Sequence, residues 1–99
     1  MERVAISQVE IDGDGRLHVV PTNHSLPYIY REGMEIQWDS GRASLHSPKP
    51  RVWSYAHWFQ QILAAAREQG CHLELSSSTR WINIDAGLKN QLLQTGNEA

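Results

Sequence analysis

The sequence predicts an α+β fold: an antiparallel β-meander of about five strands packed by one long amphipathic helix, then a short β-hairpin and a C-terminal helix. Three observations support this class. Short segments of alternating apolar and polar residues, separated by turn signals, fill the first half of the chain. Residues 53–70 carry apolar side chains at helical spacing. After Gly70 the apolar period changes from 3.6 to 2, which is the period of a strand. We expect one compact domain over residues 1–99.

The first unit is expected to be a β-hairpin. Residues 4–12 have the pattern of a strand, but their apolar positions change phase in the middle. A β-bulge near residues 7–8 explains the change, and so does a strand that is buried on both faces. The run Asp-Gly-Asp-Gly at 12–15 favours a tight turn, so residues 17–20 return as the partner strand and Pro21 ends it.

Three short strands are expected between this hairpin and the long helix. Residues 28–31 are a strand candidate, and residues 34–39 alternate Met, Ile and Trp with polar side chains. Residues 43–45 alternate in the same way. The segment 47–50 contains two prolines, which stop the sheet and lead into the helix.

The predicted helix runs from Trp53 to Gln69. Ser54 can cap its first turn, and Gly70 can close its end. One face of this helix is apolar and should cover a sheet. The apolar positions are Tyr55, Trp58, Phe59, Ile62, Leu63 and Ala66.

The remaining chain is expected to add two strands and a second helix. In residues 71–75 the odd positions are apolar, and a polar turn follows at 76–79. Residues 81–84 form a further short strand. Asp85 can cap a helix that continues to Gln94, and residues 95–99 should be a frayed tail.

Composition excludes several classes of protein. A formal charge of −2, with Lys and Arg scattered among acidic residues, argues against a nucleic-acid partner. No apolar run approaches the roughly 20 residues that a membrane span needs, so no membrane association is expected. The N-terminus lacks the apolar core of a signal peptide, which predicts a cytoplasmic protein. The single cysteine, Cys71, excludes an internal disulfide and a multi-cysteine zinc site.

Several aromatic and glycine positions form a pattern over the second half of the chain. They are Trp53-Ser-Tyr55, Trp58-Phe59, Gly70, Leu73 and Thr79-Arg-Trp81. This pattern, together with part of the 28–38 region, resembles small uncharacterised bacterial proteins, including some encoded in integron gene cassettes. The resemblance implies a bacterial, mobile-gene context and a compact α+β fold. It implies no catalytic residues.

No motif predicts a metal, a cofactor or a catalytic centre. Numbered from Asp12, the acidic turn lacks the oxygen ligand, the turn glycine and the glutamate ligand that a calcium loop requires at positions 5, 6 and 12. None of the five histidines forms a helical metal-binding pair, although His18 and His72 lie on strands and can meet across a sheet face. Cys71 and His72 point to opposite faces of one strand, so this histidine cannot easily activate the thiol.

Two groups of residues are candidates for binding. Arg80 follows a polar turn and could hold an anion while Trp81 stacks on a planar ligand; the alternative is a solvated turn before a core tryptophan. The second group has the side chains that anchor protein interfaces, or else they fill the core between sheet and helix. This group consists of Tyr28, Tyr30, Arg31, Trp38 and Trp53.

These observations favour a non-enzymatic protein-interaction or binding module, and specifically a homodimer that pairs exposed sheet edges. The first alternative is a small-ligand-binding domain with an aromatic-lined cleft, in which Arg80, His18 or Tyr28 orients the ligand. The second alternative is a small enzyme without a recognisable motif. A heterologous protein partner remains a further alternative to self-association.

Overall fold

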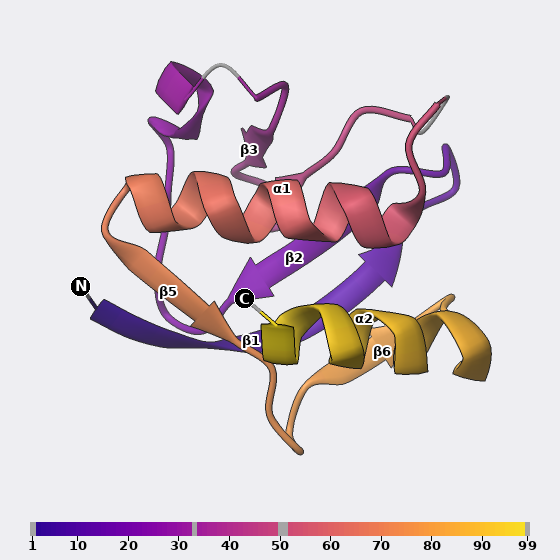
Figure 1. Ribbon diagram of the computed structural model, residues 1–99. Helices are drawn as coiled ribbons and strands as arrows, with labels where there is room; N and C mark the ends of the chain where they lie inside the picture. Colours follow the sequence, from indigo (N-terminus) through magenta and orange to yellow (C-terminus); the bar gives the residue numbers. More distant parts are fainter. Residues whose placement is uncertain (1, 33, 50–51, 99) are drawn as a thin grey trace.

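The computed structural model describes residues 2–32, 34–49 and 52–98, without the side chains of residues 97–98. Met1, Gly33, Pro50, Arg51 and Ala99 lie outside the described residues, as do the expected roles of Pro50 in ending the sheet and of Ala99 in the tail. The elements are β1 (Glu2–Ile11), β2 (Leu17–Pro21), η1 (Ile29–Glu32), β3 (Gln37–Asp39), β4 (Ser44–His46), α1 (Tyr55–Glu68), β5 (Cys71–Glu74), β6 (Arg80–Ile82) and α2 (Ala86–Glu98) (Figure 1). The predicted α+β class is confirmed.

The sheet is mixed. The strands before α1 pair antiparallel as predicted, but their order is not that of a meander, because β4 and not β3 lies beside β2. The strand order is β3-β4-β2-β1-β5, with β6 also paired to β1. β1 is antiparallel to β2 but parallel to both β5 and β6. For β5 the reason is the helix: α1 carries the chain back across the sheet, so β5 runs parallel to β4 and hence to β1. β1 thus pairs with three other strands, β2 on one edge and β5 and β6 on the other.

The strands β5 and β6 both pair with β1, so the expected C-terminal hairpin was also wrong. β5 pairs with Glu2–Ala5, and β6 pairs with Gln8–Glu10 further along the same edge. Between them the Thr79 hydroxyl donates to the Ile6 carbonyl at 2.7 Å. A side chain thus replaces the ladder hydrogen bond where the edge changes from one strand to the other.

The expected bulge in β1 is present at this same point. The register with β2 shifts between Ile6 and Gln8, and the Ser7 hydroxyl donates to the Val20 carbonyl at 3.1 Å. Because the extra residue restores the phase, Ile6 and Val9 are both fully buried. The bulge therefore explains the phase change that the sequence shows.

Residues 28–31 were expected to be a strand, but the chain forms the 3₁₀ helix η1 there. The amide of Ile29 donates to the Leu26 carbonyl, and the amide of Arg31 donates to the Tyr28 carbonyl. Ile29 is buried, whereas Tyr28 and Tyr30 are exposed. One turn of 3₁₀ helix is enough to bury the single side chain of Ile29. The apolar residues of this segment therefore do not require a strand.

α1 covers one face of the sheet, and α2 lies on the same side (Figure 1). The helix begins at Ser54, whose hydroxyl accepts the His57 amide at 3.2 Å. It ends at Gly70, which has a φ of +79°, a value that favours glycine. Both expected caps are confirmed. Its buried side chains are Trp58, Phe59, Ile62, Leu63, Ala65 and Ala66.

α2 is longer than predicted. Asp85 caps it, because its carboxylate accepts the Leu88 amide at 2.7 Å. The helix continues to Glu98, so the frayed tail expected over its last described turn was wrong. Thr95 is buried, and Gly96 lies against the side chains of Leu75 and Phe59. Packing against α1 and the end of β5 thus extends the helix. None of the helices in the described residues has the length and apolar character needed to cross a membrane.

Candidate functional site

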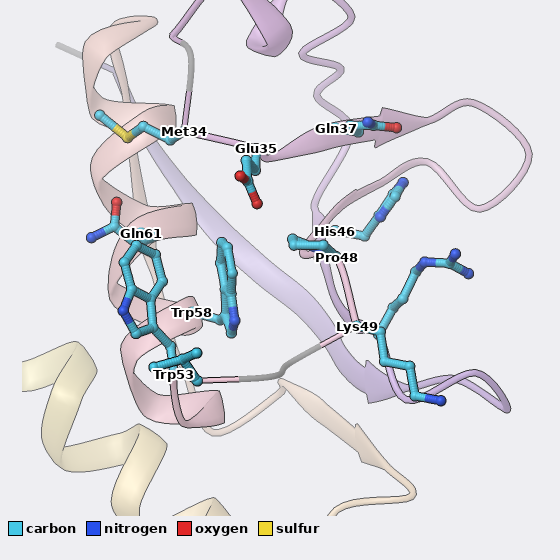
Figure 2. Close-up of a pocket in the computed structure, with 11 residues that line it drawn as sticks. Met34, Glu35, Gln37, His46, Pro48, Lys49, Trp53, Trp58 and Gln61 are labelled. Carbon is cyan, nitrogen blue, oxygen red and sulfur yellow. The ribbon is translucent and has the colours of Figure 1, made fainter.

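A groove of about 1010 Å³ lies between α1 and the segments that carry β3 and β4 (Figure 2). One wall comes from α1 and the residues before it, and the other comes from the end of β4. The approach to β3 crosses between them. The lining consists of Val52, Trp53, Trp58 and Gln61 on the first wall, His46, Pro48 and Lys49 on the second, Met34, Glu35 and Gln37 between them, and Arg16 from the β1–β2 turn.

The local sequence explains how these side chains reach the groove. Trp58 is on the apolar stripe of α1, and Trp53 precedes the Ser54 cap. Glu35 has a φ of +63°, which costs a residue with a side chain of order 1 kcal/mol or more. This backbone conformation lies next to the buried Ile36, and the Glu35 carboxylate points into the groove (Figure 2).

Trp58 is the central side chain of the groove. Its exposed fraction is 6 %, and its ring centroid lies 4.8 Å from that of Trp53. The indole Nε1–H of Trp58 is buried and has no hydrogen-bond acceptor among the described residues. A buried donor without a partner costs about 1–3 kcal/mol. Trp53 is 44 % exposed, so one aromatic side chain of the pair remains open to solvent.

The groove is lined by charged residues of both signs, and only some of them have an ion-pair partner. Arg16 contacts Asp14 at 3.0 Å, whereas Lys49 has no carboxylate within 4.0 Å among the described residues. The ring of His46 is fixed, because its Nδ1–H donates to the Ser47 carbonyl at 3.0 Å. Glu35 is exposed and supplies a carboxylate on the β3 side. The lining can therefore offer an aromatic surface, an indole donor and groups of both signs.

A second polar cluster is buried beside the β1–β2 turn. His18 Nε2 donates to the Asp12 carboxylate at 2.7 Å, and for a neutral imidazole this leaves Nδ1 to accept the Ser44 hydroxyl at 2.8 Å. Burial by itself would raise the pKa of Asp12. The hydrogen bonds from His18 and from the amides of Arg16 and Asp14 outweigh that effect and lower this pKa from 3.8 to about 2.

This cluster has the side-chain types of a hydrolase triad, but its serine hydroxyl is not accessible to a substrate. Ser44 has 0 % exposed surface, and His18 has 3 %. A nucleophilic hydroxyl must reach its substrate, and this one is sealed within the sheet. We interpret Asp12–His18–Ser44 as a structural link between the turn and β4. His46, which lines the groove, lies next to it, with ring centroids of the two histidines 5.2 Å apart.

The predicted binding residues do not form one site. Trp53 alone among them lines the groove. Trp38 and Trp81 are half-buried and pack against the core, while Arg80 is exposed. Tyr28 and Tyr30 are 55 % and 62 % exposed on η1, where the Arg31 guanidinium lies 4.8 Å from the Tyr28 ring. The interface prediction thus separates into a surface patch, a core tryptophan and a groove tryptophan.

The two strand histidines do not meet. His18 is opposite Glu10 near the end of β1, whereas His72 is opposite Arg3 near its start. Cys71 is buried, and its burial together with the nearby Glu2 carboxylate raises the pKa of the thiol. No group of three or more potential metal-ligating side chains gathers within the part of the chain that the structure describes.

Sequence reasoning missed most of the groove. Trp58 lies on the same stripe as Phe59 and Ile62, so helical spacing predicts only a core residue. Glu35, His46 and Lys49 have no motif around them. The one available signal was the pair of tryptophans on either side of the helix cap, since two large aromatic side chains at a helix start exceed what capping requires.

Comparison with known proteins identifies relatives of the whole chain. The family model described as Integron Cassette Protein Hfx_Cass5 matches residues 3–79. A solved structure from the mobile metagenome of North West Arm Sewage Outfall, described by the same name, is 49 % identical, with a TM-score of 0.51 and coverage of 98 % of each chain. No curated protein matches. The match covers well over half of the sequence, and the chain belongs to the Hfx_Cass5 family of integron cassette proteins.

Proposed function

We propose that this protein is a non-enzymatic binding module whose groove between α1 and β4 takes a small planar molecule. One observation carries the proposal: the buried Trp58 N–H has no acceptor among the described residues, and the Trp58 side chain lines a groove of about 1010 Å³. Buried donors are nearly always paired, and an unpaired one calls for an explanation. A ligand with a hydrogen-bond acceptor would pair it once the side chains that cover the nitrogen move aside, and Trp53 would provide a ring for stacking.

The groove is of a kind that suits a ligand. Small-molecule sites are concave and mostly apolar, with a few polar groups that fix orientation. Trp53, Trp58 and Met34 give the apolar surface, and Gln37 and Gln61 give the neutral polar groups. The buried Asp12–His18–Ser44 cluster, by contrast, offers no accessible nucleophile. This contrast favours binding over catalysis.

The four tryptophans allow a direct test by nuclear magnetic resonance. Isotope-labelled protein is titrated with naphthoate, naphthamide and naphthylmethylamine, and the indole N–H resonances are followed. We expect Trp53 and Trp58 to shift, because both line the groove, while Trp38 and Trp81 serve as internal controls. Shifts confined to Trp38 or Trp81, or no shift with any of the three probes, would contradict the proposal.

A second candidate function is self-association through η1. Tyr28 and Tyr30 are among the few large apolar side chains that the described residues expose, and Arg31 stacks beside them. Tyr and Arg are preferred anchors of protein contacts. In this version two copies would pair their Tyr28–Arg31 surfaces. Trp38, which was grouped with these residues from sequence, would not take part, because it packs against the core.

Analytical ultracentrifugation tests this second candidate. The wild-type chain should sediment as a dimer, and the double variant Tyr28→Ser/Tyr30→Ser should be a monomer with an unchanged fold. Trp53→Ser is the matched control, since it removes another exposed aromatic side chain from a different surface. A monomeric wild type, or a dimer that survives the double change, would exclude this version.

A further inference from the structure

We infer that the groove selects an anionic aromatic ligand, a planar ring that carries a carboxylate. This inference rests on the proposed binding function and specifies the chemical class of the ligand. It depends on three features of the lining: the unpaired indole donor, the cations on the wall opposite α1, and the position of the one carboxylate.

The first feature is the unpaired indole donor of Trp58. The Trp58 N–H is buried, and no acceptor reaches it from the described residues. A molecule that fills the groove must bring an acceptor or leave this donor unpaired. Hydrogen bonds to an ionised acceptor are roughly twice as strong as neutral ones. A carboxylate oxygen is therefore a better partner for Trp58 than an amide carbonyl is.

The charges of the far wall favour the same ligand. Lys49 and Arg16 both line the groove, and Lys49 has no ion-pair partner among the described residues. The partner of Arg16, Asp14, is itself 76 % exposed, so water screens much of that pair. With Glu35 as the single carboxylate of the lining, the cations outnumber the anions.

The position of Glu35 makes the two ends of the groove differ in charge. Its carboxylate approaches Trp58 from the β3 side, and the indole nitrogen is at the end of the ring that points away from Glu35 (Figure 2). Lys49 lies across the groove from α1 (Figure 2). A ligand carboxylate at the nitrogen end would gain the indole donor and stay clear of Glu35. The Lys49 side chain extends away from Trp58 (Figure 2) and would turn toward the ligand on binding. The ring of the ligand would stack on Trp53.

The charge series of naphthalene probes tests this assignment. Naphthoate, naphthamide and naphthylmethylamine have the same ring, but their charges are negative, neutral and positive. We expect naphthoate to bind most tightly and the amine most weakly. Lys49→Gln should weaken naphthoate binding by about fivefold, the scale of one exposed ion pair, and leave naphthamide binding unchanged. Lys89→Gln is the matched control, because Lys89 lies on α2 beside Trp81.

The outcomes separate this inference from the proposed function. Equal binding of naphthoate and naphthamide at Trp53 and Trp58 would overturn the preference for an anion and leave the binding site intact. Tightest binding of the amine would also overturn it and would assign the selectivity to Glu35. If none of the probes moves the two indole resonances, the binding function fails and this inference fails with it. Loss of naphthoate binding in Lys89→Gln would show that Lys49 acts only through overall charge, which also overturns the assignment.

Discussion

Two buried polar regions of this small protein differ in how their hydrogen bonds are satisfied. In the Asp12–His18–Ser44 cluster the histidine has a partner on each ring nitrogen, at 2.7 Å and 2.8 Å. In the groove, the Trp58 N–H is equally sealed from water and has no partner among the described residues. The first arrangement stabilises the fold, and the second lowers stability unless something binds.

This difference shows why the cluster that resembles a catalytic triad is the weaker functional candidate. Its groups are already paired, and Ser44 is sealed. The groove is open to solvent, and the Trp53 side chain within it is 44 % exposed, whereas Ser44 is fully buried. An unsatisfied group beside an accessible aromatic surface is a better indicator of a site than a familiar set of residue types. Variants that affect one region and not the other test this difference.

The largest effect is expected from His18→Ala. This change leaves Ser44 buried and Asp12 half-buried without their shared partner and should lower the free energy of unfolding by about 3 kcal/mol. Urea denaturation followed by circular dichroism measures it. The half-buried His72, which lies on β5 opposite the start of β1, is the control, and His72→Ala should cost about 0.5 kcal/mol or less. Similar losses in the two variants would refute the structural role of the cluster.

A somewhat smaller effect is expected from pH. Because the folded protein lowers the pKa of Asp12 from 3.8 to about 2, the ionised carboxylate stabilises the fold above the unfolded value. This contribution disappears as the pH falls from 3.8 toward 2, and it is at most about 2 kcal/mol, since water partly screens a turn carboxylate. Urea titrations across this range should show a steeper loss for the wild type than for Asp12→Asn. Parallel curves would mean that Asp12 does not carry the acid sensitivity.

The hairpin, the bulge in β1 and the capped helix were predictable because each depends on neighbouring residues. The phase change at residues 7–8 and the Ser54 cap are local signals, and the structure has both. The parallel pairing of β5 and β6 was not predictable in this way. It depends on where α1 delivers the chain, and on the Thr79 hydroxyl at Ile6, a contact between residues far apart in sequence.

The groove was not predictable from the sequence, because it too depends on residues far apart along the chain. Trp58 and Phe59 are adjacent on the same apolar face of α1, yet Phe59 is fully enclosed and Trp58 borders an opening. Periodicity tells which face of a helix is covered, not whether the cover is complete. Composition also does not tell which aromatic residues are exposed. In the structure Tyr28 and Tyr30 lie outside the core, whereas Trp38 packs against it.

The smallest change in stability is expected from Trp58→Phe, and it tests the groove most sharply. The substitution removes the unpaired N–H and retains an aromatic ring, so the lost packing is partly offset by the loss of an unsatisfied donor. We expect the free energy of unfolding to fall by no more than about 1 kcal/mol, while naphthoate binding weakens severalfold because a charged hydrogen bond is lost. Trp81→Phe, outside the groove, should leave naphthoate binding unchanged. Full binding in Trp58→Phe would mean that the unpaired indole N–H is only a defect of packing, and the contrast between the two buried regions would then say nothing about function.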